Sequence, residues 1–208
     1  MKQLSKFLML LVFGMFAACT TTPDGPASSD TFSDAGLDFS ITKPSDWHFI
    51  TDETLQADRN TIRLSDAELE QLAKRNANAP LVVFTRYPEP YPTLNPSASV
   101  TLATMPMEKV PPKYALSLST EMTKQAYPDL EVVEAVRDHE VDGIQGAYTR
   151  VKYTVAFADG QEFPTMVRMW IVPRGKIMFV IGMTSPPEGP DLSEEAFQEI
   201  LKSIKIAR

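Results

Sequence analysis

The chain of 208 residues has few of the residue types that build disulfides and metal sites. It contains one cysteine, Cys19, and two histidines, His48 and His139. A single cysteine cannot form a disulfide within the chain, so the hydrophobic core alone must stabilise the fold. The two histidines fall in separate predicted strands and lack the ligand spacing of a zinc site. We therefore expect neither a metal nor another cofactor.

Positive charge is also scarce, because 20 Lys and Arg residues stand against 27 Asp and Glu residues, for a net charge of −7. A chain this acidic is a poor partner for nucleic acids and for anionic lipids. The sequence contains no G-x-S-x-G nucleophile motif and no glycine-rich phosphate loop. We interpret its many carboxylates as solvated surface, and we expect a protein that is not an enzyme.

The first nineteen residues have the organisation of a secretory signal peptide. Lys2 and Lys6 precede an apolar run at residues 7–16, and small residues lead to Cys19. The run is shorter than the about 20 apolar residues that a membrane-spanning helix needs, which argues against a transmembrane anchor. A second alternative makes Cys19 a buried structural thiol. The coincidence of the cysteine, the small residues and the apolar run favours a processed and lipidated terminus.

Residues 16–19, Phe-Ala-Ala-Cys, resemble the lipobox of bacterial lipoproteins, in which a diacylglyceryl group is added to the cysteine sulfur before cleavage. The pattern prefers leucine where this chain has Phe16. The resemblance implies that residues 1–18 are removed and that lipid on Cys19 holds the protein on a membrane. Thr20 stands where aspartate would retain a Gram-negative lipoprotein at the inner membrane. We expect a cell-envelope protein, on the outer membrane and facing the periplasm if the source is Gram-negative.

The chain after the signal peptide divides into a tether and one domain. Residues 20–34 are polar, contain proline and carry almost no apolar side chains, which is the composition of a flexible linker. We expect residues 19–35 to comprise the lipidated cysteine and its tether. Residues 36–208 are expected to form a single domain, which is long enough to bury one core.

Hydrophobic periodicity predicts the elements of that domain. Alternating apolar residues indicate strands, and apolar residues at i, i+3, i+4 and i+7 indicate helices. The C-terminal helix is the clearest, because apolar residues from Phe197 to Ile204 follow the helical spacing, and Asp191 or Ser193 is placed to cap it. The expected strands cover residues 37–41, 47–50, 81–87, 97–105, 130–141, 144–157, 163–172 and 176–184, and two further helices cover residues 66–76 and 112–126.

This order of elements predicts an α+β fold with a largely antiparallel sheet, because consecutive hairpins join the later strands. Helices at both ends and in the middle can cover the faces of such a sheet. The middle helix is expected to pack against the sheet by one face, made of Ala115, Leu118, Met122 and Ala126.

Several short segments resemble the PsbP-like superfamily, which includes the DcrB-type bacterial lipoproteins. They are Leu37-Asp38-Phe39-Ser40-Ile41 with Pro44 and Trp47, Val141-Asp142-Gly143, Arg168-Met169-Trp170, and the closing helix from Phe197 to Ile204. The resemblance implies an antiparallel sheet sandwiched by helices, and a non-enzymatic assembly or accessory factor. It transfers no functional residue to this chain.

The central hairpin supplies a first candidate site through its register. A two-residue turn would place the apolar residues of its two strands on opposite faces of the sheet, since a slip of one residue inverts every side chain. A three-residue turn at Ala158-Asp159-Gly160, with a left-handed glycine, places them together. This register pairs two arginines, Arg150 with Arg168, and two aromatics, Tyr148 with Trp170, on the other face.

Two arginines directly opposite each other are destabilising, so an acidic group is expected beside them. One alternative is a carboxylate of the same chain, or plain solvent, because exposed ion pairs contribute little. The other is an anionic ligand or partner beside Trp170. We therefore name Arg150, Arg168, Trp170 and Tyr148 as a candidate binding surface.

A second candidate surface is the proline-rich loop that contains Tyr87 and Tyr91. Its simplest role is a connector between strands, but stiff aromatic loops on rigid scaffolds often carry binding. Our first functional hypothesis is a lipid-anchored, non-catalytic envelope protein that binds or helps assemble a periplasmic or outer-membrane protein. The alternatives are a carrier with a small-ligand pocket between sheet and helix, and a hydrolase with an unrecognised site.

Overall fold

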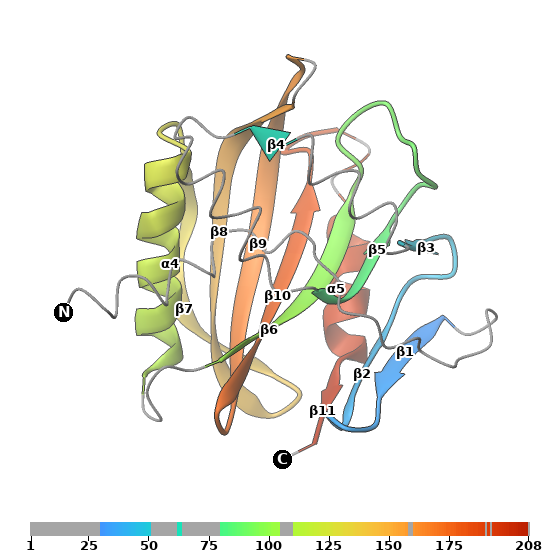
Figure 1. Ribbon diagram of the computed structural model, residues 1–208, viewed down its shortest axis with the longest axis vertical. Helices are drawn as coiled ribbons and strands as arrows, with labels where there is room; N and C mark the ends of the chain where they lie inside the picture. Colours follow the sequence, from blue (N-terminus) through green and yellow to red (C-terminus); the bar gives the residue numbers. More distant parts are fainter. Residues whose placement is uncertain are drawn as a thin grey trace.

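The computed structural model describes residues 30–50, 62–63, 80–104, 110–157, 160–189, 191 and 193–207. Within them, the main element is an eight-stranded antiparallel sheet in the order β3-β5-β6-β10-β9-β8-β4, with β7 also paired to β8 (Figure 1). Its strands are β3 (His48–Phe49), β4 (Ile62–Arg63), β5 (Pro80–Thr85), β6 (Ser97–Thr104), β7 (Glu131–Val141), β8 (Ile144–Phe157), β9 (Glu162–Arg174) and β10 (Ile177–Ser185).

A second, three-stranded sheet lies beside the first and joins the two ends of the described chain. Its order is β1-β2-β11, with β1 (Thr31–Asp34), β2 (Phe39–Thr42) and β11 (Lys205–Ile206). The carboxylate of Asp142, in the turn between β7 and β8, accepts a hydrogen bond from the backbone N–H of Ile206 at 2.8 Å. The small sheet is thereby attached to the large one.

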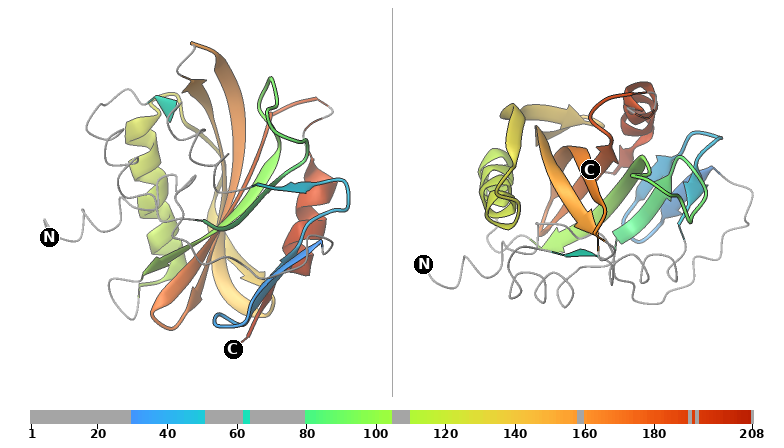
Figure 2. Two further views of the ribbon diagram at one scale, coloured as in Figure 1. Left: turned by 45° about the vertical axis from the view of Figure 1, so that its right-hand side comes forward. Right: turned by 90° about the horizontal axis from the view of Figure 1, so that it is seen from above.

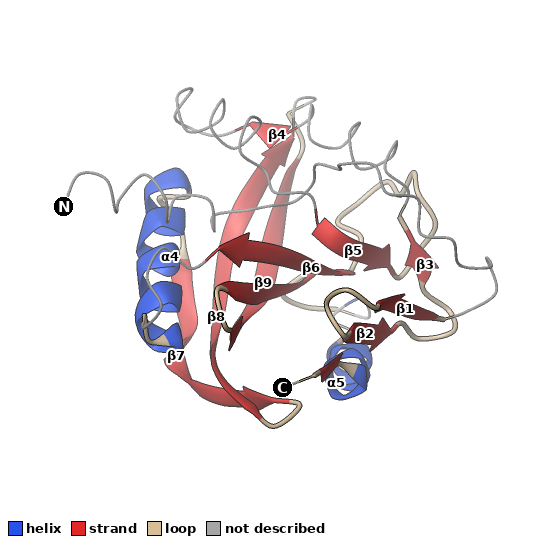
Figure 3. Ribbon diagram, turned by 60° about the horizontal axis from the view of Figure 1, so that its bottom comes forward, coloured by secondary structure: helices blue, strands red, loops and turns tan. Residues whose placement is uncertain are grey.

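Two helices cover the opposite faces of the large sheet, α4 (Pro112–Ala126) and α5 (Glu194–Ser203) (Figures 2 and 3). Successive residues of β10 show the division, because Met178 packs on the α4 side and Phe179 on the α5 side. The predicted fold class is confirmed: the protein is α+β, mostly antiparallel sheet, with helices on both faces.

The α5 side holds the larger core. Phe197 of α5 makes an edge-on contact with Trp47, at 5.9 Å between ring centroids, and Trp47 makes a similar contact with Phe84 of β5 at 6.0 Å. These rings are almost fully buried. The helical spacing that predicted α5 thus marks the face that packs on the sheet, since Ile200 and Ile204 are buried as well.

The buried face of α4 differs from the predicted one. Ala115 and Ala126 are buried as expected, but Leu118 and Met122 are only partly buried, and the centre of the face consists of Leu116, Ser119, Thr120 and Thr123. Thr120 and Thr123 hide their hydroxyls by donating to carbonyls one turn earlier, at 2.9 Å each. Apolar periodicity alone did not predict this face because small hydroxyl residues occupy it.

The register of the central hairpin is confirmed. The backbone N–H of Phe157 donates to the carbonyl of Gln161 at 2.9 Å, which encloses three residues, and Gly160 has φ of +84°. Arg150 is paired with Arg168, and Tyr148 with Trp170. A left-handed glycine at this turn therefore sets the positions of side chains many residues away.

The folded part begins earlier than residue 36. Thr31–Asp34 form β1, inside the segment that we interpreted as tether, and pair along the whole of β2. The ring of Phe32 lies 6.5 Å from that of Phe39, so one apolar residue anchors an otherwise polar strand. The predicted signal peptide, Cys19 and the helix predicted over residues 66–76 lie outside the described residues.

Candidate functional site

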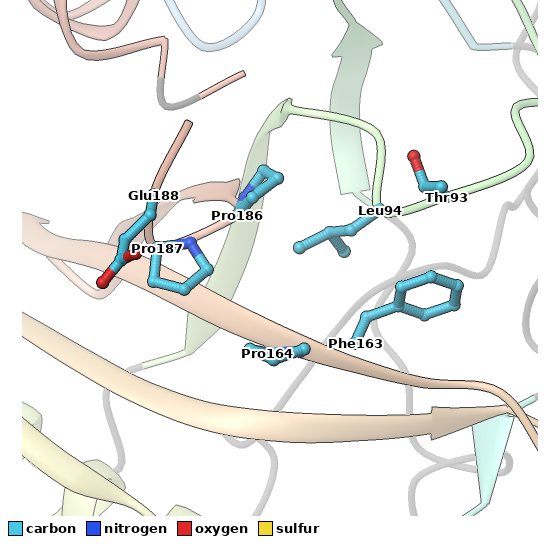
Figure 4. Close-up of a pocket in the computed structure, with 7 residues that line it drawn as sticks. All are labelled: Thr93, Leu94, Phe163, Pro164, Pro186, Pro187 and Glu188. Atoms are coloured by element: carbon cyan, nitrogen blue, oxygen red, sulfur yellow. The ribbon is translucent and has the colours of Figure 1, made fainter. Parts of the chain in front are cut away.

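Two loops and the start of β9 line a groove of about 310 Å³ at one end of the sheet (Figure 4). Leu94 and Phe163 lie across the groove from Pro186 and Pro187, and Pro164 lies below (Figure 4). The volume is at the lower end of the range for small-molecule sites. The groove opens to solvent, which suits a side chain of another molecule better than an enclosed ligand. Its lining residues are Thr93, Leu94, Phe163, Pro164, Pro186, Pro187 and Glu188.

The groove exists because the start of β9 extends past the point where its antiparallel neighbour β10 ends. The last pair between these strands is Ser185 with Met166, so Glu162 and Pro164 extend beyond the end of β10. A proline at such an open edge has no N–H to donate to an added strand. The groove therefore presents rings and side chains rather than an edge suited to lengthening the sheet.

Hydrogen bonds within the loop between β5 and β6 hold the first wall of the groove. Asn95 bonds the backbone of Tyr87 in both directions: its Oδ1 accepts from Tyr87 N–H at 3.1 Å, and its Nδ2 donates to Tyr87 C=O at 2.9 Å. The Asn95 amide also donates to Glu89 at 2.7 Å, and Glu89 accepts from the N–H of Tyr91 at 2.8 Å. The loop that presents Leu94 is thus internally braced.

The two tyrosines of this loop, Tyr87 and Tyr91, stack on each other with 4.5 Å between ring centroids and 12° between planes. The Tyr87 hydroxyl donates to the carboxylate of Asp191, just before α5, at 2.6 Å. This hydrogen bond, together with burial, raises the pKa of Tyr87. Arg86 donates to Ser193 at 3.2 Å and lies 3.7 Å from Asp191, so the loop is fixed to the start of α5.

Arg168 holds the second wall from inside the protein. Its Nη1 donates to the Ser185 hydroxyl at 3.3 Å, and that hydroxyl donates to the carbonyl of Pro186 at 3.0 Å. Its Nη2 forms an ion pair with Glu194 at the start of α5. Arg168 is only 1% exposed and lies over the ring of Phe197. A buried charge therefore links the proline wall to α5.

Two carboxylates of the same chain offset the repulsion between the paired arginines, Arg150 and Arg168. Arg150 Nε lies 3.0 Å from Glu134 Oε1, as an ion pair without an aligned hydrogen bond, and Arg150 Nη1 lies 3.9 Å from Glu194. Glu194 thus contacts both arginines. Glu134 also accepts from the hydroxyl of Tyr148 at 3.2 Å. Burial, and next the charge of Glu134, raise the pKa of Tyr148 to about 12.

Burial changes the roles of the residues named from the sequence. Trp170 is 2% exposed, with its ring 4.8 Å from that of Tyr148, and Arg168 is buried too. Both lie on the face that α5 covers, so they support the structure and present no surface to a partner. Arg150, Tyr87 and Tyr91 remain half-buried.

Ser193 occupies the N-cap position of α5, as predicted, but does not cap it. Its φ of +58° is left-handed, and its hydroxyl donates to the carbonyl of Asp191 at 3.2 Å instead of accepting from the helix. The segment at Asp191 and Glu194 joins the two candidate surfaces, which the sequence presented as separate. The groove was not predicted from the sequence; the Pro186-Pro187 pair is a local feature that could have drawn attention to it, but no local pattern indicates which segments it meets.

In the part of the chain that the structure describes, no three or more His, Cys, Asp or Glu side chains lie close enough to hold a metal ion. In the same residues, neither helix combines the length and the apolar character needed to cross a bilayer.

No protein-family model and no curated protein matches the chain. Solved structures that match over most of it include cyanobacterial PsbP from Synechocystis sp. PCC 6803, with 15% identity, 91% of this chain, 98% of that chain and a TM-score of 0.50. They also include LpqN of Mycobacterium tuberculosis, with 11% identity, 88% of this chain, 87% of that chain and a TM-score of 0.51. These identities are low, so the likeness concerns the fold alone, and the expected PsbP-like fold is confirmed.

A third match, a structure from Bacteroides thetaiotaomicron, shares 14% identity over 86% of this chain with a TM-score of 0.42. The chain spans about half the length of that protein, 49%. LpqN is described as involved in cell envelope biogenesis.

Proposed function

We propose that this protein is a lipid-anchored, non-catalytic envelope protein that binds a partner protein at the groove between Leu94 and Pro187. The observation that carries the proposal is an apolar groove whose walls are both fixed to the start of α5. A groove that is already rigid loses little conformational entropy on binding. The envelope role described for LpqN is consistent with the proposal.

Two features favour a binding protein over an enzyme. The carboxylates beside the groove walls, Asp191 and Glu194, are engaged by arginines and a tyrosine and serve as structural ties. The groove itself is lined by prolines, leucine and phenylalanine, with one acid and one threonine. Such a lining offers contact area but no paired acid and base.

A carrier with a pocket between sheet and helix is the second candidate, and the packing disfavours it. The contact of α4 with the sheet is filled by alanines, Leu116 and methionines, and that of α5 by aromatic rings. The cavity that the structure shows lies instead among loops and opens to solvent.

Site-specific photo-crosslinking in cells tests the binding proposal. A photoreactive residue replaces Leu94 on one wall or Glu188 on the other, in the full-length lipoprotein, and replaces Glu121 on the exposed face of α4 as a control. We expect the same protein to be captured from both walls and not from Glu121. Equal capture from all three positions, or none from either wall, would contradict a partner site in the groove.

The anchor is tested separately at Cys19. We propose that residues 1–18 are removed, that Cys19 carries lipid, and that residues 19–29 connect it to β1. Lipid chains contribute about 0.8 kcal/mol per buried CH₂, and stable anchoring takes more than one chain. Replacement of Cys19 by alanine should release the protein from membranes or block its processing. A variant that is processed normally and still fractionates with membranes would disprove lipidation.

A further inference from the structure

The rim of the groove carries negative charge that no ion pair with another described residue neutralises. Glu188 lines the groove, and Glu162 directly precedes Phe163. Both side chains belong to exposed residues, and neither forms an ion pair with any other residue that the structure describes. By contrast, Glu134, Asp191 and Glu194 nearby are all paired with arginine. Among the described residues, Glu162 and Glu188 thus bring unpaired negative charge to the groove.

The wall chemistry restricts what can enter between these carboxylates. The rings of Phe163, Pro164, Pro186 and Pro187 offer apolar contact, and Leu94 faces them. Prolines supply carbonyl acceptors but no N–H donors. A bound group must therefore be apolar at its centre and, if polar at its edges, a donor or a cation.

We infer that the groove binds a short polypeptide segment of the partner in which an aromatic or branched aliphatic side chain is flanked by lysine or arginine. This inference rests on the proposed function and specifies the partner's chemistry. The apolar side chain fills the space between Leu94 and Pro187, and the flanking cations approach Glu162 and Glu188. The net charge of −7 steers such a segment toward the protein.

Charge complementarity separates this occupant from two others. A fatty acyl chain with a free carboxylate, or one attached to an anionic headgroup, would bring a like charge to Glu162 and Glu188. A second copy of this chain carries the same excess of acid. Strand addition is excluded as the binding mode, because Pro164 lacks the N–H that the added strand would need.

Fluorescence anisotropy with the purified full-length lipoprotein in detergent tests the inference. The probes are three labelled octapeptides on one glycine-serine frame, with phenylalanine flanked by two lysines, phenylalanine flanked by two glutamates, and serine flanked by two lysines. We expect the lysine-flanked phenylalanine to bind best, by about tenfold or more over either control. Its affinity should fall as salt is raised, since the cations act through screened charges.

Variants assign the effect to the groove. Replacement of Glu188 by glutamine should weaken this peptide by about threefold, whereas Glu199→Gln, the same change on the exposed face of α5, should have no effect. Leu94→Ser should weaken it by about tenfold through lost apolar contact. An unchanged midpoint of urea unfolding shows that each variant is folded.

The outcomes distinguish this inference from the proposed function. Equal binding of lysine-flanked and glutamate-flanked peptides, or insensitivity to Glu188→Gln, would overturn the cationic ligand. Absence of peptide binding at the groove would overturn it as well. If a protein is nevertheless captured in cells from both Leu94 and Glu188, the groove is a partner site with another chemistry. If no capture occurs there, both proposals fail.

Discussion

The two faces of the large sheet are both buried, but they are built from different residues. The α4 face consists of aliphatic side chains, methionines and the tyrosine pair Tyr127 and Tyr153, and it includes threonines whose hydroxyls bond within the helix. The α5 face combines aliphatic side chains with a cluster of phenylalanine and tryptophan rings, and it includes the buried charge of Arg168. Arg168 and the segment before α5 contact both walls of the groove. The α4 face therefore contributes packing, and the α5 face also positions the site.

The largest expected effect is the loss of stability when one core residue from each face is replaced by alanine. Phe197→Ala on α5 should lower the free energy of unfolding by about 3–5 kcal/mol, because it removes a ring that contacts Trp47 and Arg168. Leu116→Ala on α4 should cost about 2–5 kcal/mol. Urea denaturation measures both losses.

The two core variants should differ at the groove even where their stabilities agree. We expect Phe197→Ala to weaken binding of the lysine-flanked peptide, since it loosens the support of Arg168. Leu116→Ala should leave that affinity unchanged. An equal loss of peptide affinity in both variants would show that the two faces do not differ in this respect.

The next effect concerns the paired arginines. Arg168→Gln should destabilise the protein by about 2–4 kcal/mol, because it removes a buried charge and leaves Ser185 and Glu194 without their donor. Arg150→Gln, at a half-buried position with 28% of the side chain exposed, should cost about 1 kcal/mol or less. Thermal denaturation of both variants checks the difference. A double variant as stable as the parent would mean that repulsion between the arginines cancels their ion pairs.

A smaller effect is expected at the link between loop and helix. Tyr87→Phe removes the hydroxyl that donates to Asp191 and should cost about 1 kcal/mol. Tyr91→Phe is the matched control, because it keeps the stacked ring in place. Tyr87→Phe should lower both the free energy of unfolding, measured by urea denaturation, and the affinity for the peptide. Tyr91→Phe should change neither. Identical behaviour of the two would show that Asp191 does not hold the loop.

The smallest effect is a pH dependence on the α5 face. Burial, and then the charge of Arg137, lower the pKa of His139, whose ring lies 6.1 Å from that of Trp170. The unfolded chain therefore binds a proton more readily than the folded one. The contribution of neutral His139 is present above its ordinary pKa of about 6.5 and is lost as the pH falls below it.

Equilibrium unfolding of the parent and of His139→Gln between neutral and mildly acidic pH measures this contribution. The parent should lose stability more steeply than the variant as the pH falls. Parallel curves would show that the pKa of His139 is the same in the folded and unfolded states.

Residues within one or two turns of each other determined most of the secondary structure and the central register. Alternating side chains set the strands, the spacing of Phe197 and Ile204 set α5, and Gly160 set the pairing of Arg150 with Arg168. These features follow from sequence because each depends on the local backbone and on one continuous apolar face. The α+β class follows from them.

Tertiary packing decided what those local elements do. Arg168 is neutralised by Glu194, 26 residues along the chain, and the groove forms only where the loop before β6, the start of β9 and the segment after β10 meet. The strand at Thr31–Asp34 reads as linker until β2 pairs with it. Burial of Trp170 likewise depends on where α5 lies. The sequence alone determined the apolar faces of the central strands and of α5. Only the packing of α5 on the sheet decided which charges are paired and which remain for a partner, because ion pairing depends on distances between segments that are remote in sequence.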